Sequence, residues 1–147
     1  MKLPETFLEN MKELLGGEYS AWLASYEESP RQGLRINTGK LTAEAWKSIS
    51  PYGTDPVLWT GNGYYVGDQD RPARDPYYYA GLYYLQEPSA MAPAVLLPVE
   101  PGDRVLDLCA APGGKSTELG ARLKGQGLLV SNDISNSRAK ALLKNLE

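Results

Sequence analysis

The sequence predicts an α/β protein in two parts: a small N-terminal α/β domain over residues 1–74, then the first βαβα part of a Rossmann-like domain over residues 75–147. Two observations support this fold class. A short apolar run at 105–108 leads through a loop of small residues into a helical stretch, and another apolar run follows at 128–130. Strands that alternate with helices in this way are typical of a parallel sheet, whose strands read as short apolar runs.

The N-terminal part begins with a helical pattern. Pro4 suits a first-turn position, and apolar residues recur at helical spacing over residues 4–15, where Gly16 and Gly17 end the pattern. The elements predicted next are a helix over 18–26, a strand over 33–38 and a short helix that Thr42 caps and that carries Trp46 and Ile49.

The middle of the chain carries turn and cap signals. The sequence Gly61-Asn62-Gly63 separates the apolar runs 57–59 and 64–66, which predicts a β-hairpin. Asp75-Pro76 is a typical start for a helix, which we expect to continue through Tyr83. Ser89 is expected to cap the next helix, and Pro98 to end it.

The loop after the first strand of the second part is the most informative stretch. It consists of small residues and one proline, which let the backbone approach a ligand closely, and the following helix is expected to begin near Ser116 or Thr117. A strand, a tight loop and a helix start direct backbone N–H groups toward an anionic group. Asp133 follows Gly113 by 20 residues, about where a nucleotide-binding βαβ unit places the carboxylate that holds a ribose diol.

Composition bounds the class of protein. The chain has 147 residues, of which 42% are hydrophobic and 22% charged, as in a globular protein without a membrane span or signal peptide. Its net charge of −3 argues against a general nucleic-acid clamp. A single cysteine fits a reducing cytoplasm. Because the chain has no histidine, Ser–His and Cys–His mechanisms and an ordinary zinc site are excluded, and we expect no metal site.

Several signatures compete for the loop. Gly114-Lys115-Ser116 imitates the end of a Walker A loop and thus a nucleoside-triphosphate hydrolase, but Cys109 stands where that loop needs its first glycine. The dinucleotide pattern Gly-x-Gly-x-x-Gly is absent. An ordinary strand-to-helix turn without a ligand is the remaining alternative.

The nine residues from Asp107 to Lys115 read Asp-Leu-Cys-Ala-Ala-Pro-Gly-Gly-Lys. They resemble the cofactor loop of the RNA 5-methylcytosine methyltransferases of the NOL1/NOP2/Sun family. The resemblance extends to residues 34–38 and 81–89, and is greatest for bacterial enzymes that methylate cytosine in small-subunit ribosomal RNA. The family often shows His-Pro before the tyrosines, where this chain has Asp75-Pro76.

The resemblance implies S-adenosylmethionine as the cofactor and a Rossmann-like methyltransferase domain. Asp107 is expected to order the loop, Asp133 to hold the ribose hydroxyls, and Arg138 either to line the site or to be a surface arginine. The residues implied to bind the cofactor are Cys109, Ala110, Ala111, Pro112, Gly113, Gly114, Lys115, Asp133 and Arg138.

The same resemblance implies that catalysis needs more than this chain. The family adds a cysteine thiolate to carbon 6 of cytosine, and its catalytic cysteines lie on later strands, so no catalytic residue is assigned here and Cys109 is not the nucleophile. We therefore expect the N-terminal part of a longer cytoplasmic methyltransferase, inactive alone, with ribosomal RNA favoured over transfer RNA as substrate. The alternatives are a transfer-RNA methyltransferase and a non-catalytic nucleotide- or RNA-binding module.

Tyrosines and arginines in the first part allow two interpretations. The tyrosines at 64–65, 77–79 and 83–84 either stack on RNA bases or pack between the two small domains with their hydroxyls in solvent, and the sparse basic residues around them favour packing. Arg31 and Arg35 either contact RNA or lie in solvent at the surface, as most arginines do.

Overall fold

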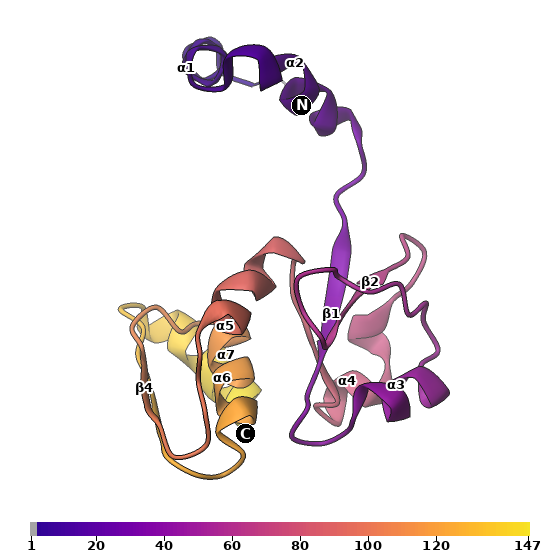
Figure 1. Cartoon of the computed structure of the whole chain (residues 1–147), viewed down its shortest axis with the longest axis vertical. Coiled ribbons are helices and arrows are strands. Elements are labelled where there is room, and N and C mark those ends of the chain that lie inside the picture. Colours follow the sequence, from indigo (N-terminus) through magenta and orange to yellow (C-terminus); the bar gives the residue numbers. More distant parts are fainter. Residues whose placement is uncertain (1–2) are drawn as a thin grey trace. The chain divides into compact units, whose positions relative to one another are not determined.

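The computed structural model describes residues 3–147, which pack as two units, one up to Pro30 and one from Arg31 to Glu147. The first unit holds helices α1 (Glu5–Leu15) and α2 (Tyr19–Ala24), drawn in indigo and violet in Figure 1. Both helices lie within their predicted ranges. No helix in the part of the chain that the structure describes is long and apolar enough to cross a membrane.

Aromatic contacts hold the two helices of the first unit together. The ring of Trp22 lies 5.8 Å from that of Phe7, 5.6 Å from that of Tyr19 and 5.1 Å from that of Tyr26, measured between centroids. Gly16 ends α1 with a φ of +51°, a conformation that glycine adopts without strain. Phe7 of α1 therefore packs on Trp22 of α2, whereas Leu14 on the same helix is 76% exposed and no residue of α1 is fully buried.

The second unit begins with a small antiparallel sheet, in which β1 (Gln32–Ile36) lies between β2 (Gly63–Val66) and β3 (Tyr83–Leu85). The helices beside it are α3 (Ala43–Ile49), capped by Thr42 as predicted, and α4 (Pro76–Tyr79), capped by Asp75 (Figure 1). One face of this sheet is closed by a buried apolar cluster made of Leu34, Ile36, Trp46, Tyr64, Val66 and Tyr83.

The second unit continues as a βαβα motif. Strands β4 (Arg104–Asp107) and β5 (Leu128–Ser131) pair in parallel, and α6 (Gly114–Leu123) connects them. Helix α7 (Asn136–Leu146) follows β5, and α5 (Ala92–Leu96) packs on α6 (Figure 1). The predicted α/β class and the Rossmann-like βαβα part are confirmed. Its buried apolar cluster is Ala94, Val99, Val105, Leu119 and Leu123.

Two predicted elements are wrong, and so is the predicted cap at Ser89, because its hydroxyl donates to the Glu87 carboxylate and caps no helix. Residues 57–59 form no strand, because the N–H of Thr60 donates to the carbonyl of Val57 and makes a turn, while β2 pairs with β1. The helix predicted from Asp75 through Tyr83 ends at Tyr79, because Gly81 adopts a φ of +66° and reverses the chain into β3. This reversal brings the ring of Tyr83 within 5.3 Å of Trp46 in the core, which a longer helix would prevent.

The predicted burial of the first parallel strand holds for one face. Val105 and Asp107 point toward α6 and are buried, whereas Leu106 is 58% exposed. Within the second unit, residues 31–147, the opposite face of the strand pair is uncovered, since α6 packs on one side only. Strand β3 lies after residue 75 and yet pairs with β1, and the division of the chain into domains at residues 74 and 75 stays a prediction.

Candidate functional site

The loop between β4 and α6 takes a compact conformation. It contains a cis peptide bond between Ala111 and Pro112, and Gly113 is buried with a φ of +122°. A Cβ atom at Gly113 would be strained in that conformation and would lie 3.3 Å from the Cβ of Asn145 in α7. Helix α6 begins at Gly114, two residues before the earlier of the two predicted starts, because the turn at Gly113 already directs the backbone into the helix.

Asp107 orders this loop from beneath, as the resemblance implied. One carboxylate oxygen accepts a hydrogen bond from the backbone N–H of Cys109 at 3.2 Å, and the other accepts one from the hydroxyl of Ser116 at 2.8 Å. The hydroxyl of Ser131 in β5 donates to Ser116 at 2.9 Å. Ser116 therefore does not cap α6 but joins both strands to the helix from a fully buried position.

Asp133 and Arg138 hold the middle of the loop. The carboxylate of Asp133 accepts hydrogen bonds from the N–H of Ala111 at 3.1 Å and of Ser135 at 3.0 Å, while Arg138 donates to the carbonyl of Ala111. The guanidinium of Arg138 lies 3.6 Å from the Asp133 carboxylate. The bond from Ser135, together with that from Ala111 and the charge of Arg138, holds the pKa of Asp133 below its ordinary value.

The two ends of the loop are also tied to the loop itself and to α7. The ammonium of Lys115 donates to the carbonyl of Cys109 at 3.1 Å, and the amide of Asn145 donates to the carbonyl of Pro112 at 2.7 Å. The structure thus brings the predicted residues 109–115, Asp133 and Arg138 together in one place. The thiol of Cys109 is exposed and free.

The small sheet forms a further wall of this site, which the sequence analysis missed. Gly114 lies so close to β3 and the residue after it that an added Cβ would come within 2.8 Å of the Gln86 amide nitrogen and 3.3 Å of the Tyr84 ring. Gly114 has an ordinary helical φ, so a side chain there would not strain the backbone but would displace the Gln86 amide from the loop. No local sequence pattern indicates such a contact.

Arg35 carries this contact between the two sheets. Its guanidinium donates to the carbonyl of Gly114 and to the hydroxyl of Thr117, the latter at 2.6 Å, and its Nε lies 3.1 Å from the carboxylate of Glu118. The expectation that Arg35 lies in solvent or contacts RNA is wrong, because the residue is 3% exposed. Arg35 lies opposite Gly63 in the sheet, and no local sequence pattern that we find signals its burial.

The ion pair of Arg35 and Glu118 is fully provided with partners. The amide of Asn62 donates to the Glu118 carboxylate at 2.9 Å, and the hydroxyl of Thr60 donates to the Asn62 carbonyl oxygen at 2.6 Å. Burial lowers the pKa of Arg35, and the charge of Glu118 opposes that shift. An arginine keeps its proton in proteins, so Arg35 stays charged, and its bonds to Gly114, Thr117 and Glu118 hold α6 against the small sheet.

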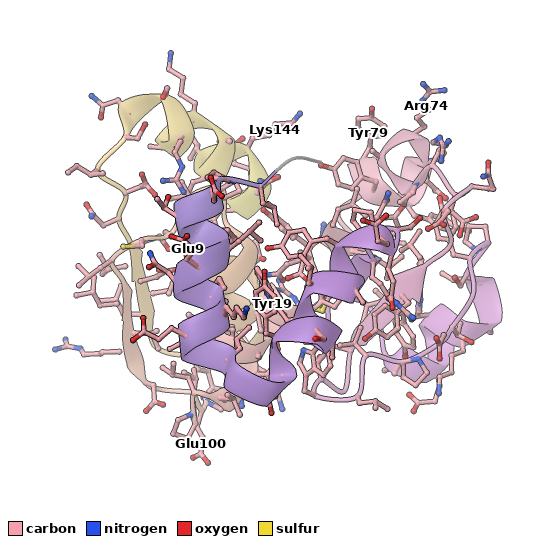
Figure 2. The ribbon with its side chains drawn as sticks, turned by 90° about the horizontal axis from the view of Figure 1, so that it is seen from above. Glu9, Tyr19, Arg74, Tyr79, Glu100 and Lys144 are labelled. Atoms are coloured by element: carbon pink, nitrogen blue, oxygen red, sulfur yellow. The ribbon has the colours of Figure 1, made fainter. Side chains whose placement is uncertain are left out.

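The packing of the tyrosines that the sequence analysis favoured over stacking on RNA lies within the core of the small sheet, and the hydroxyl of Tyr83 is not in solvent but donates to the carbonyl of Pro72 at 2.8 Å. Tyr64 and Tyr83 are buried, and Tyr77 and Tyr78 pack against the same core cluster. Tyr79 is 73% exposed, and in Figure 2 its side chain points outward like that of Arg74. Among residues 3–147 the structure contains no group of three or more histidine, cysteine, aspartate or glutamate side chains that could hold a metal ion.

Taken together, two parallel strands joined by a helix, a small-residue loop at the helix start and an acidic residue after the second strand define the Rossmann-like class of α/β folds. Comparison with known proteins gives the family. The family model for the N-terminal domain of 16S rRNA methyltransferase RsmF matches residues 3–88, and that for 16S rRNA methyltransferase RsmB/F matches residues 94–147. The chain therefore belongs to the RsmF family of 16S rRNA methyltransferases, which confirms the family resemblance.

Relatives and solved structures agree with this assignment. The chain is 34% identical to ribosomal RNA small subunit methyltransferase F of Enterobacter sp. (strain 638) over 97% of its own length and 32% of the relative. For the Shewanella amazonensis protein of the same name, identity is 40% over 80% of this chain and 27% of the relative. The chain thus spans about a third of the length of these curated relatives.

Two solved structures share the fold. A methyltransferase homolog protein from Pyrococcus horikoshii superposes with a TM-score of 0.85 and 26% identity, covering 98% of this chain and 48% of that one. NSun6 from P. horikoshii with SFG gives a TM-score of 0.82 at 16% identity, covering 97% and 62% of the two chains. The second likeness supports the fold alone.

Proposed function

We propose that this chain forms the S-adenosylmethionine-binding part of an RNA (cytosine-5)-methyltransferase that acts on small-subunit ribosomal RNA. The observation that carries the proposal is the loop over residues 109–115, where Gly113 turns the backbone into the start of α6 beside Asp133. The cytoplasm, where ribosomal RNA is modified in bacteria, is the proposed compartment. A transfer RNA substrate is the alternative that the test below separates.

The residues present fit S-adenosylmethionine. The first-turn N–H groups of α6 have no partner within the helix, so they are suited to the carboxylate of the methionine moiety. Each oxygen of Asp133 accepts one backbone hydrogen bond and keeps a further lone pair, which suits the ribose hydroxyls. We propose Cys109, Ala110, Ala111, Pro112, Gly113, Gly114, Lys115, Asp133 and Arg138 as the binding residues.

In this proposal the chain binds and orients the cofactor, and none of its own residues is catalytic. The bound cofactor would supply an electrophilic methyl group. Asp133 would fix the ribose, the start of α6 the carboxylate, and Asp107 the loop between them through its bonds to Cys109 and Ser116. Cys109 belongs to the cofactor loop, and its backbone carbonyl accepts a hydrogen bond from the Lys115 ammonium.

Binding of S-adenosylmethionine by the purified chain, measured by isothermal titration calorimetry, tests the cofactor assignment. We expect saturable binding that does not require magnesium and that Asp133→Asn weakens by about tenfold, the usual scale for one charge-assisted hydrogen bond. Asp68→Asn, at an exposed loop position, is the matched control and should leave affinity within about twofold. Magnesium-dependent binding of ATP in place of S-adenosylmethionine would refute the proposal.

The substrate is tested separately with the complete gene product. Incubated with tritiated S-adenosylmethionine, it should label unmodified small-subunit ribosomal RNA, and digestion should release 5-methylcytidine. Labelling of transfer RNA alone would replace the ribosomal substrate while leaving the cofactor assignment intact.

A further inference from the structure

We propose that Arg35, which lies in the small antiparallel sheet, is a positioning residue for the cofactor site. Arg35 acts by fixing the direction of two backbone N–H groups at the start of α6. The inference rests on the proposed function, because these N–H groups are the ones that would bind the carboxylate of S-adenosylmethionine. It extends that function by making the small sheet a structural part of the cofactor site.

The hydrogen bonds from Arg35 end on two successive peptide groups of the loop. One guanidinium nitrogen donates directly to the carbonyl of Gly114. The other donates to the hydroxyl of Thr117 at 2.6 Å, and that hydroxyl donates to the carbonyl of Gly113 at 2.9 Å. Arg35 therefore holds the Gly114 carbonyl itself and the Gly113 carbonyl through Thr117.

Holding these carbonyls also fixes the N–H groups on the other side of each peptide bond. A trans peptide group is planar, and its C=O and N–H point in opposite directions. The carbonyl of Gly113 shares its plane with the N–H of Gly114, and the carbonyl of Gly114 shares its plane with the N–H of Lys115. The carbonyl of Gly114 is bonded toward the small sheet by Arg35, whereas that of Gly113 is bonded along α6 by both the N–H and the hydroxyl of Thr117. The N–H groups of Gly114 and Lys115 point the opposite way from these carbonyls. They belong to the first turn of α6, where N–H groups lack partners within the helix.

Arg35 is itself held in place from the small-sheet side. Its Nε pairs with Glu118 at 3.1 Å, the carboxylate of Glu118 accepts from Asn62 at 2.9 Å, and the side-chain oxygen of Gln86 accepts from the guanidinium. The ring of Tyr84 lies 5.7 Å from the guanidinium carbon. A lysine ammonium cannot reach these acceptors on separate residues at once, because it lacks the planar fork of arginine.

The two parts of the ligand should respond differently. The carboxylate of S-adenosylmethionine is its only anionic group, and the N–H groups that Arg35 orients would contact that group alone. Asp133, which would hold the ribose, makes no contact with Arg35 and is fixed by Ala111 and Ser135. 5′-Methylthioadenosine shares the adenosine and sulfur of the cofactor but has no carboxylate, so its affinity should not depend on Arg35.

The test compares Thr117→Val with Thr117→Ser and Arg35→Lys with Arg31→Lys in the purified chain. Affinities for S-adenosylmethionine and for 5′-methylthioadenosine are measured by calorimetry, and thermal unfolding is recorded in parallel. Thr117→Val removes the hydroxyl at nearly constant volume, whereas Thr117→Ser keeps it. Arg31 is exposed, and its guanidinium lies 5.6 Å from the centre of the Tyr65 ring and not in the cofactor loop, which makes its substitution the matched control.

We expect Thr117→Val and Arg35→Lys to lower the affinity for S-adenosylmethionine about tenfold, equivalent to about 1.4 kcal/mol, with less than about twofold change for 5′-methylthioadenosine. Thr117→Ser and Arg31→Lys should bind both ligands like the wild type. Equal losses for both ligands, or no loss for either, would overturn the role of Arg35 while leaving the cofactor proposal standing. Failure of the wild type to bind either ligand would instead remove the proposed function itself.

Discussion

The small antiparallel sheet and the parallel pair of strands in the second unit have strands of similar length, but their faces are buried to different extents. In the antiparallel sheet, Leu34 and Ile36 of the central strand are completely buried beneath Trp46. In the parallel pair, Leu106 is 58% exposed and its cross-strand partner Val130 is 46% exposed. One sheet is enclosed by residues of this chain, and the other is covered by α6 on a single face.

Because of this difference, we expect the small sheet to contribute mainly to stability and the parallel pair mainly to ligand binding. The small sheet has a continuous apolar core, so most of the stabilisation from burial is expected there. The parallel pair carries the loop, Asp107 and Asp133, and its polar groups are arranged around the start of α6. Arg35 and Glu118 connect the two regions, so that the enclosed sheet supports the open one.

The largest effect should come from the core of the small sheet. Trp46→Ala removes a fully buried ring whose Nε1 has no hydrogen-bond partner, so the loss is one of packing, and we expect a cost of about 3–5 kcal/mol in the free energy of unfolding. Leu106→Ala on the open face should cost less than about 1 kcal/mol. Urea denaturation followed by circular dichroism measures both, and similar costs for the two variants would contradict the comparison.

The sequence predicts the parallel pair better than the small sheet. Strands at 105–108 and 128–130 and the helices after them are recognisable because each is specified by neighbouring residues: an apolar run, a turn and a capping serine at 135. The small sheet is assembled from distant segments, so local patterns miss its pairing. The reversal at Gly81 and the turn at 57–60 follow from long-range contacts with Trp46 and β1.

The site shows the same limit. Residues 109–115 and Arg138 were assigned from the family resemblance, and Asp133 also from its spacing to Gly113, and the structure brings all of them together. Arg35 and Gln86 were missed because they reach Gly114 from positions 79 and 28 residues away in sequence. An arginine in a strand looks like a surface residue unless its buried acidic partner, here Glu118, is known.

A moderate effect is expected where the parallel pair buries polar groups. Ser116→Ala leaves the buried Asp107 carboxylate without one of its donors and the Ser131 hydroxyl without its acceptor, so we expect a cost of about 1–3 kcal/mol. Ser48→Ala, in the exposed helix α3, should cost less than about 0.5 kcal/mol. Chemical denaturation of both variants measures these costs. If Ser116→Ala leaves the free energy of unfolding unchanged, the hydrogen bond from Ser116 to Asp107 does not stabilise the fold.

A smaller effect, confined to acid, is expected at Asp133. Its folded-state pKa is depressed by the bonds from Ser135 and Ala111, so the unfolded chain binds the proton first as pH falls. The stabilisation is therefore fully present above the ordinary aspartate pKa of about 3.9 and is lost as pH falls through the folded value.

Acid unfolding of Asp133→Asn should reveal this loss. The variant should be less stable than the wild type at neutral pH, and the difference should shrink below about pH 4, where the wild-type carboxyl becomes neutral as well. Asp68→Asn serves as the control at an exposed position. A difference that stays constant down to the acid transition would show that the charge of Asp133 does not stabilise the loop.

The smallest effect on stability should come from the open face of the parallel pair, although that face should matter most for association. Leu106 lies opposite Val130, and with Leu108 and Leu128 these side chains form one exposed apolar surface. Replacing Leu106 and Val130 together by threonine places a β-branched strand former at both positions and should change the free energy of unfolding by less than about 0.5 kcal/mol for each substitution. Because exposed apolar surfaces of this kind drive association, the double variant should self-associate less in sedimentation velocity. Leu58 beside the small sheet is 88% exposed, so Leu58→Thr is the control and should leave association unchanged. If Leu58→Thr reduces association as much as the double variant does, the open face of the parallel pair has no special role in association.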